Sequence, residues 1–219
     1  MLLKDKVCIV AGAASLRSIG YATAELFVKH GAHVVVTDVM MNDAVLNQIK
    51  FEIEKNLGVS IEVEGIQCDI SQKIECDRLI AQVLSKYGAI DCLVNSAGIV
   101  RSGSILDISE AELSLMFDIN LKGAFYLCQS VLEVFVKQKS GNIVNVASLA
   151  AQRGGGLVGG AHYAASKGGM LSLTKSIARE FGHLGIRANS ICPAMIDTPM
   201  VDGLSPERLQ SITDAIPLR

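Results

Sequence analysis

The sequence predicts an α/β fold: a single doubly wound parallel sheet with helices on both faces. Short β-branched runs alternate with longer amphipathic segments, and those runs are apolar throughout. Strands of a parallel sheet are covered on both faces, so they lack the polar and apolar alternation of a half-exposed strand. With 219 residues, of which 50% are hydrophobic, the chain can bury one large core, and we expect one domain over residues 1–219.

The expected elements follow one another in β-α order. The strands cover residues 7–10, 33–37, 61–67, 90–94, 142–146 and 186–191. The helices lie near residues 20–30, 43–57, 72–87, 110–138 and 163–182. Glycines such as Gly31 and Gly88 stand between a helix and the next strand, as helix ends favour. In such a sheet ligands bind beyond the carboxyl ends of the strands, so the residues there are site candidates.

Composition excludes several classes of function. A net charge of -2 leaves no basic surface for nucleic acid or an anionic membrane. No apolar run approaches the roughly 20 residues that span a bilayer, and the N-terminus becomes charged too early for a signal peptide. The six cysteines form no C-x-x-C pair, so we expect buried reduced thiols, no metal site and a cytoplasmic location.

A turn of small residues between the first strand and the first helix is the expected cofactor site. Gly12 permits a tight turn, and the N–H groups and dipole of the following helix attract a pyrophosphate. The expected contacts from this turn are Gly12, Ser15, Arg17, Ser18 and Ile19.

Asp38 closes the second strand, where a carboxylate can accept hydrogen bonds from the adenosine ribose hydroxyls. It would repel a 2′-phosphate, so we expect NAD. Arg17 keeps NADP open, because a guanidinium in this turn is able to bind a 2′-phosphate.

Tyr163 and Lys167 are four residues apart, a spacing that places both side chains on one face of a helix. A free phenol titrates at a pKa of about 10, and a neighbouring cation lowers that pKa toward the range useful for acid/base catalysis. Taken alone, the pair is a weak signal, since both residues are common on helix surfaces.

Further motifs accompany this pair. Asn95-Ser96-Ala97-Gly98 follows the fourth strand, and Asp69-Ile70 follows the third. Asn120 and Ser148 precede the Tyr163 helix, and a Pro193 to Thr198 segment follows the last strand. With these motifs, essentially the whole chain resembles the short-chain dehydrogenase/reductase family and its Rossmann-type fold. The resemblance is closest to the 3-oxoacyl-acyl-carrier-protein reductase-like group.

The resemblance implies a catalytic tetrad. Tyr163 is the general acid/base, Lys167 lowers its pKa and holds the nicotinamide ribose, and Ser148 polarises the substrate oxygen. Asn120 anchors a water that connects Lys167 to solvent. The implied cofactor contacts outside the glycine turn are Asp69, Ile70, Asn95, Ala97, Gly98, Tyr163, Lys167, Pro193, Ile196 and Thr198.

The chain departs from the family pattern in two places. The glycine turn begins with Ala11 and carries two extra residues near Leu16 and Arg17, with Ser18 in place of a glycine. Residues 17–22 are similar to the loop of the enoyl reductase branch, but that branch spaces its tyrosine and lysine further apart. Relatives of this type continue for some thirty residues, so we expect a C-terminally truncated chain without the final strand.

The sequence therefore predicts an NAD(P)-dependent enzyme that interconverts a secondary alcohol and a ketone, as a homo-oligomer, either tetramer or dimer. Two alternatives stay open, a 3-oxoacyl-carrier-protein reductase that uses NADPH and a catalytically silent nucleotide-binding scaffold. The expected substrate pocket is apolar. Its expected lining is Leu149, Ala150, Gln152, Leu157, His162 and Met195.

Overall fold

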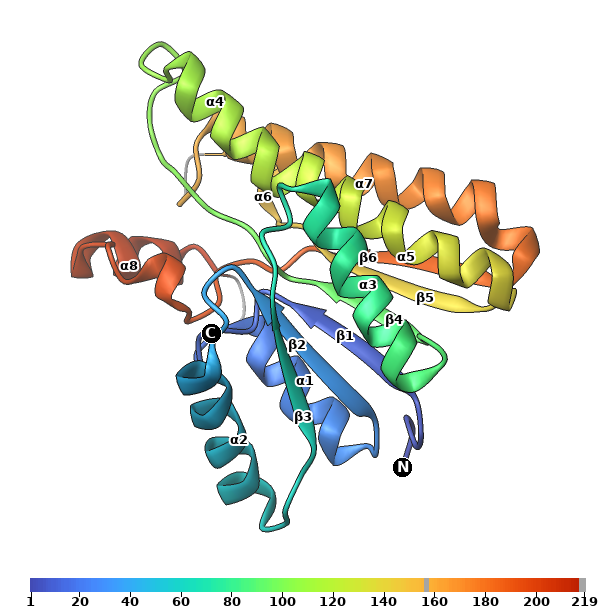
Figure 1. Cartoon of the computed structure of the whole chain (residues 1–219). Helices are drawn as coiled ribbons and strands as arrows, with labels where there is room; N and C mark the ends of the chain where they lie inside the picture. Colours follow the sequence, from blue (N-terminus) through green and yellow to red (C-terminus); the bar gives the residue numbers. More distant parts are fainter. Residues whose placement is uncertain (156–157, 217–219) are drawn as a thin grey trace.

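The computed structural model describes residues 1–155 and 158–216 and contains one six-stranded sheet (Figure 1). The strand order is β3-β2-β1-β4-β5-β6, and every neighbouring pair is parallel. The strands are β1 (Val7–Ala11), β2 (His33–Asp38), β3 (Val63–Gln67), β4 (Cys92–Asn95), β5 (Gly141–Val146) and β6 (Ile186–Ile191). The predicted α/β sheet is confirmed, with strand ends that differ from the expected ones by no more than two residues.

Helices cover both faces of the sheet and form two hydrophobic clusters with it. One cluster packs β-strand residues against Leu79, Leu127 and Ile177, which belong to α3 (Lys73–Tyr87), α5 (Ala124–Gln138) and α7 (Ala161–Phe181). The other packs Tyr21 and Ile49 of α1 (Ile19–Lys29) and α2 (Asp43–Leu57) against the opposite face. The remaining α-helices described are α4 (Glu110–Phe117), α6 (Ala150–Arg153) and α8 (Pro206–Asp214).

The long helix expected over residues 110–138 is interrupted. A π-helical segment, η1 (Asp118–Gly123), separates α4 from α5. The side chain of Asn120 in this segment bonds both backbone groups of Ile99. At its end, a Cβ on Gly123 would lie 2.8 Å from Cγ1 of Ile70. The π-helical segment thus makes contacts with residues distant in the sequence, which hydrophobic periodicity does not reveal. Such segments often mark functional sites.

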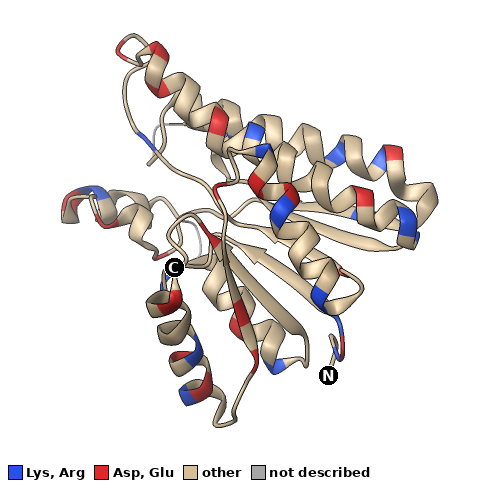
Figure 2. Cartoon of the chain, in the orientation of Figure 1, with Lys and Arg blue, Asp and Glu red and all other residues tan. Residues whose placement is uncertain are grey.

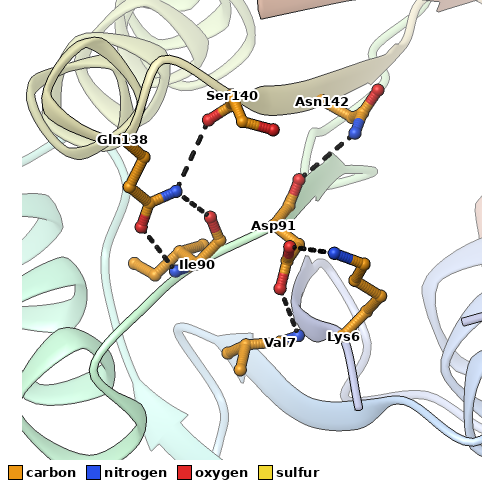
Figure 3. A network of polar contacts seen from close by, with 7 residues as sticks. All are labelled: Lys6, Val7, Ile90, Asp91, Gln138, Ser140 and Asn142. Atoms are coloured by element: carbon orange, nitrogen blue, oxygen red, sulfur yellow. Dashed lines mark hydrogen bonds and ion pairs between the residues drawn. The ribbon is translucent and has the colours of Figure 1, made fainter. Parts of the chain in front are cut away.

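Polar contacts tie together the amino ends of three strands, at the edge of the sheet remote from the candidate site (Figure 3). Asp91 accepts hydrogen bonds from Nζ of Lys6 at 2.8 Å and from the backbone N–H of Val7 at 2.9 Å. The Gln138 amide bonds the backbone of Ile90 in both directions, at 3.1 and 2.7 Å. These contacts satisfy the backbone groups where β1 and β4 begin.

Charged residues lie mainly on the helices and loops, with both signs interspersed, while the strands are almost free of them (Figure 2). This distribution follows from burial, because a strand covered on both faces would have to desolvate a charge. Among the residues placed by the structure, no helix has the length and apolar character needed to cross a membrane.

The described sheet ends at β6, beside an open groove of about 600 Å³. Ile191 at the end of β6 is an apolar side chain that is 45% exposed. The groove lies between α1 and the β4-β5-β6 part of the sheet. Its lining is Leu16, Arg17, Ser18, Ile19, Ala22, Thr23, Leu26, Phe27, Val94, Val144, Val146, Ile191, Ile196 and Asp197.

Candidate active site

A cleft of about 770 Å³ opens at the carboxyl ends of β1, β2, β4 and β5. Most residues predicted from the sequence line it, although they come from seven separate parts of the chain. They are Gly12, Ser15, Ser18, Ile19, Asp38, Asp69, Ile70, Ala97, Gly98, Ser148, Tyr163, Lys167, Pro193, Ile196 and Thr198. Arg17, Asn95 and Asn120 are not part of this lining.

The glycine turn after β1 packs directly against the end of β4. Gly12 has a φ of +81°, and a Cβ there would lie 2.5 Å from the backbone nitrogen of Ala97. A Cβ on Gly20 would lie 2.3 Å from the carbonyl oxygen of Gly12. Only glycine fits either position, so the backbone can approach a ligand closely here.

Ser18, which stands where the family pattern has a glycine, caps α1. Its hydroxyl accepts a hydrogen bond from the N–H of Tyr21 at 3.0 Å. Because Ser18 and Ile19 line the cleft, the N-terminus of α1 lies at the cavity. Its dipole and free N–H groups favour an anion, so the turn fits a pyrophosphate despite its two extra residues.

Asp38 is fixed at the end of β2 by two backbone N–H groups. Its Oδ2 accepts from Ala14 at 3.2 Å and its Oδ1 from Met40 at 3.0 Å. Each carboxylate oxygen has a second lone pair for a ribose hydroxyl. The residues around this end of the cleft therefore fit the adenosine half of NAD, and the carboxylate disfavours a 2′-phosphate.

Arg17, predicted to contact the cofactor, is not part of the cleft lining. Its Nη2 lies 2.6 Å from Oδ1 of Asp197 and 2.9 Å from Oδ1 of Asp202. Its Nη1 donates to Oδ2 of Asp202 at 3.1 Å. Two carboxylates thus already neutralise the guanidinium, which removes the sequence argument that it binds a 2′-phosphate.

Asn95, predicted to contact the cofactor, lies within the sheet and is not part of the cleft lining. It is fully buried, and its Nδ2 donates to Oδ1 of Asn145, its register partner on β5, at 3.5 Å. Nδ2 of Asn145 then donates to Oγ1 of Thr174 on α7 at 2.9 Å. This polar connection anchors the helix that carries Tyr163 and Lys167. Sequence reasoning missed Asn145 and Thr174, although an asparagine at the end of one strand and another one residue before the end of the next were a visible signal.

Tyr163 and Ser148 both line the cleft, where their side chains share a hydrogen bond. Burial raises the pKa of the Tyr163 phenol above its usual value of 10.0, and a hydrogen bond with Ser148 lowers it in part. The sequence predicts a lowered pKa from the Lys167 charge, whereas desolvation dominates in the fold. Burial destabilises the phenolate relative to the neutral phenol. Tyr163 is therefore protonated at neutral pH.

Lys167 lies on α7, about one turn after Tyr163, and also lines the cleft. Its ammonium is almost completely buried and donates to the carbonyl oxygen of Val146, the last residue of β5, at 2.9 Å. Burial lowers the pKa of Lys167 to about 8. The ammonium still carries its charge at pH 7, close to the cavity that it lines.

Asn120 connects the loop after β4 to α7. Its Oδ1 accepts from the N–H of Ile99 at 2.8 Å, and its Nδ2 donates to the carbonyl of Ile99 at 2.9 Å and to Oγ of Ser166 at 3.2 Å. A Cβ on Gly98 would lie 2.9 Å from Oδ1 of Asn120 and 3.3 Å from Nζ of Lys167. A side chain at position 98 would therefore crowd both the Asn120 amide and the Lys167 ammonium, and glycine avoids this.

Much of the cleft is lined by apolar residues. Leu149, Ala150 and Met195 line it as predicted, whereas Gln152 and His162 do not. Leu157 lies outside the residues that the structure describes. The lining residues that sequence reasoning missed include Ile99, Val100, Arg153, Val158, Met200 and Val201.

The sheet order reverses between β1 and β4, and the cleft opens at that switch point, which defines a Rossmann-type nucleotide-binding protein. The family model described as enoyl-(acyl carrier protein) reductase matches residues 12–219. An uncharacterised short-chain type dehydrogenase/reductase of Sinorhizobium fredii is 39% identical over 100% of this chain and 85% of that protein. The 3-oxoacyl-acyl-carrier-protein reductase FabG of Thermotoga maritima is 35% identical over 100% of this chain and 85% of that protein.

Solved structures agree with these matches. A short-chain dehydrogenase/reductase from Burkholderia xenovorans superposes with a TM-score of 0.86 at 32% identity, over 98% of this chain and 83% of that one. An NAD+-bound xylitol dehydrogenase gives 0.79 at 29% identity, over 89% of this chain and 72% of that one. The chain belongs to the short-chain dehydrogenase/reductase family and is an NAD(P)-dependent oxidoreductase that acts on CH–OH groups.

Proposed function

We propose that the enzyme interconverts a secondary alcohol and a ketone, prefers NAD, and uses Tyr163 as its general acid/base. One observation carries the proposal: Ser148, Tyr163 and Lys167 line the same cleft as Gly12 and Asp38. A group that can exchange a proton thus shares a cavity with the residues that fit a dinucleotide.

The two halves of the cofactor would meet different residues. Gly12 and Ser18 would hold the pyrophosphate, and Asp38 the adenosine ribose, with Asp69 and Ile70 beside the adenine. Ala97 and Gly98 would lie between the two halves, and Pro193, Ile196 and Thr198 would flank the nicotinamide; all five residues line the cleft. When bound, the nicotinamide supplies or accepts the hydride.

The chain's own residues handle the proton. Oη of Tyr163 would give its proton to the substrate oxygen in reduction and take one from the alcohol in oxidation, a contribution of roughly 10² to 10⁴ in rate. The Ser148 hydroxyl would donate a hydrogen bond to the same oxygen as negative charge develops there. The raised pKa of Tyr163 favours proton donation at neutral pH, and oxidation then gains from alkaline conditions.

Lys167 would stabilise the phenolate form of Tyr163 and hold the nicotinamide ribose. Its buried ammonium is fixed by Val146 and lines the cavity. For Asn120 we keep the proposed role of anchoring a water between Lys167 and solvent. The supporting observation is that Gly98 adds no side chain between the Asn120 amide and the Lys167 ammonium.

A second candidate is a 3-oxoacyl-carrier-protein reductase that uses NADPH, as the name of the Thermotoga maritima relative indicates for that protein. The position of Asp38 argues against it, because the carboxylate would face the 2′-phosphate. A catalytically silent scaffold is the third possibility, and the complete set of Ser148, Tyr163 and Lys167 in one cleft argues against that.

We also propose a homo-oligomer, tetramer or dimer, and a cytoplasmic location. Exposed apolar side chains on α4 and α5, such as Leu113, Leu115 and Phe125, support association of subunits. The six cysteines are free thiols, which supports a reducing compartment. Sedimentation equilibrium of the purified chain tests the oligomer, and a monomer at all concentrations would rule it out.

The test of the activity is Tyr163→Phe, with Tyr126→Phe on α5 as a matched control. Ketones, secondary alcohols and an acetoacetyl thioester are assayed with NAD(H) and with NADP(H). We expect Tyr163→Phe to lower turnover at least about 100-fold while NADH binding, followed by fluorescence, is retained. Full activity in this variant would refute the Tyr163 assignment, and turnover of the thioester with NADPH alone would favour the second candidate.

A further inference from the structure

An ion-pair cluster joins two parts of the chain that are about 180 residues apart. Arg17 belongs to the glycine turn between β1 and α1, and Asp197 and Asp202 flank the short helix η3 (Pro199–Val201) beyond β6. Both terminal nitrogens of Arg17 bind Asp202, at 3.1 and 2.9 Å, and Nη2 also binds Asp197 at 2.6 Å. We call these three residues the Arg17 cluster.

The cluster connects two segments that form walls of the cofactor cleft. Ser15, Ser18 and Ile19 of the glycine turn line one wall, and Arg17 lies among them in the sequence. Residues 195–201 line the other wall, except Asp197, which turns to Arg17. Arg17 and Asp197 instead line the neighbouring groove, so the ion pairs lie outside the cavity.

Few other polar contacts hold the second wall in place. Within the part of the chain that the structure describes, the hydrogen bonds that link residues 194–204 to other regions are those that Arg17 donates to Asp197 and Asp202. The remaining backbone bonds there are local, such as Val201 to Thr198 and Leu204 to Val201. Breaking the cluster would therefore release this wall while β6 and α7 keep their own contacts.

We propose that Arg17 is a positioning residue that closes residues 195–202 over the cofactor and thereby sets the rate of cofactor exchange. The proposal rests on cofactor binding in this cleft, as the proposed function states. Arg17 acts through the two aspartates and not by touching the cofactor. The Arg17 side chain is half exposed, so added salt weakens the cluster and should speed the exchange.

The test compares the wild type with Arg17→Gln and Asp202→Asn. Arg179→Gln, which removes an exposed arginine near the end of α7, is the control. Stopped-flow fluorescence measures NADH dissociation, and hydrogen–deuterium exchange of residues 196–204 is measured on the protein alone. We expect about two- to five-fold faster dissociation in either variant, the range that exposed ion pairs support, and faster exchange in that segment.

Two further arms separate positioning from general damage. In the wild type, raising sodium chloride from low to high concentration should speed NADH dissociation, and in Arg17→Gln this dependence should largely disappear. The charge swap that combines Arg17→Asp with Asp202→Arg should restore slow dissociation. Each variant is also assayed for KM and kcat, and we expect the cofactor KM to rise without an equal loss of the hydride-transfer rate.

The outcomes distinguish this proposal from the proposed function. Wild-type dissociation rates and exchange in Arg17→Gln would overturn the positioning role while leaving cofactor binding intact. Failure of the charge swap to restore slow dissociation would also count against it. If the wild type binds neither NADH nor NADPH, the proposed function fails first and the proposal fails with it.

Discussion

Replacing the buried Lys167 by methionine should change how the stability of the protein depends on pH. Burial lowers the pKa of Lys167 from 10.5 to about 8. In the unfolded chain the same group titrates near its ordinary value, so the unfolded state binds more protons between about pH 8 and 10.5. The folded state therefore carries a charge penalty below pH 8 that disappears as the pH rises through this window.

The penalty corresponds to about 3 kcal/mol, and most of it, about 2.5 kcal/mol, is relieved between pH 7 and 10. Urea unfolding without cofactor, measured at several pH values in this range, gives the free energy of unfolding of each protein. We expect the wild type to gain about 2.5 kcal/mol relative to Lys167→Met from pH 7 to pH 10. Other titrating groups cancel in this difference because both proteins contain them.

The control is Lys175→Met, which removes an exposed lysine from the same helix. Its unfolding free energy should run parallel to that of the wild type over the whole pH range. Parallel curves for Lys167→Met as well would refute the reasoning, because they would show that the ammonium is not desolvated. The absolute stability of Lys167→Met is less informative, since the carbonyl of Val146 loses its hydrogen-bond donor.

Two other substitutions test the cofactor end of the cleft. Gly12→Ala should destabilise the protein by roughly 2 to 4 kcal/mol in urea unfolding, because its Cβ would meet the Ala97 backbone at 2.5 Å. Gly88→Ala, with a similar positive φ and open space around it, should cost only about 1 kcal/mol, and equal losses would contradict the close-packing argument. Asp38→Ser should raise NADPH affinity relative to NADH at least about ten-fold in fluorescence titrations; an unchanged ratio would show that Asp38 does not select the cofactor.

Local patterns predicted the strands and the residues that follow them. Asp38 and Ser148 could be placed in one cleft before the fold was known, because the carboxyl ends of parallel strands meet at one edge of the sheet. The π-helical turn at Asn120 escaped prediction, because the bonds that accompany it reach Ile99 and Ser166, which are 21 and 46 residues away. The bond between Asn95 and Asn145 escaped prediction for the same reason, since Asn145 lies on the neighbouring strand.

The sequence by itself determined the α/β sheet, the glycine turn and the presence of Ser148, Tyr163 and Lys167 in a family-like order. These features depend on periodicity and spacing, which local chemistry dictates. The tertiary structure alone decided that Arg17 pairs with Asp197 and Asp202, and that desolvation governs the pKa values of Tyr163 and Lys167. Ion pairs between distant segments and the loss of water from a buried group arise only when the chain is folded.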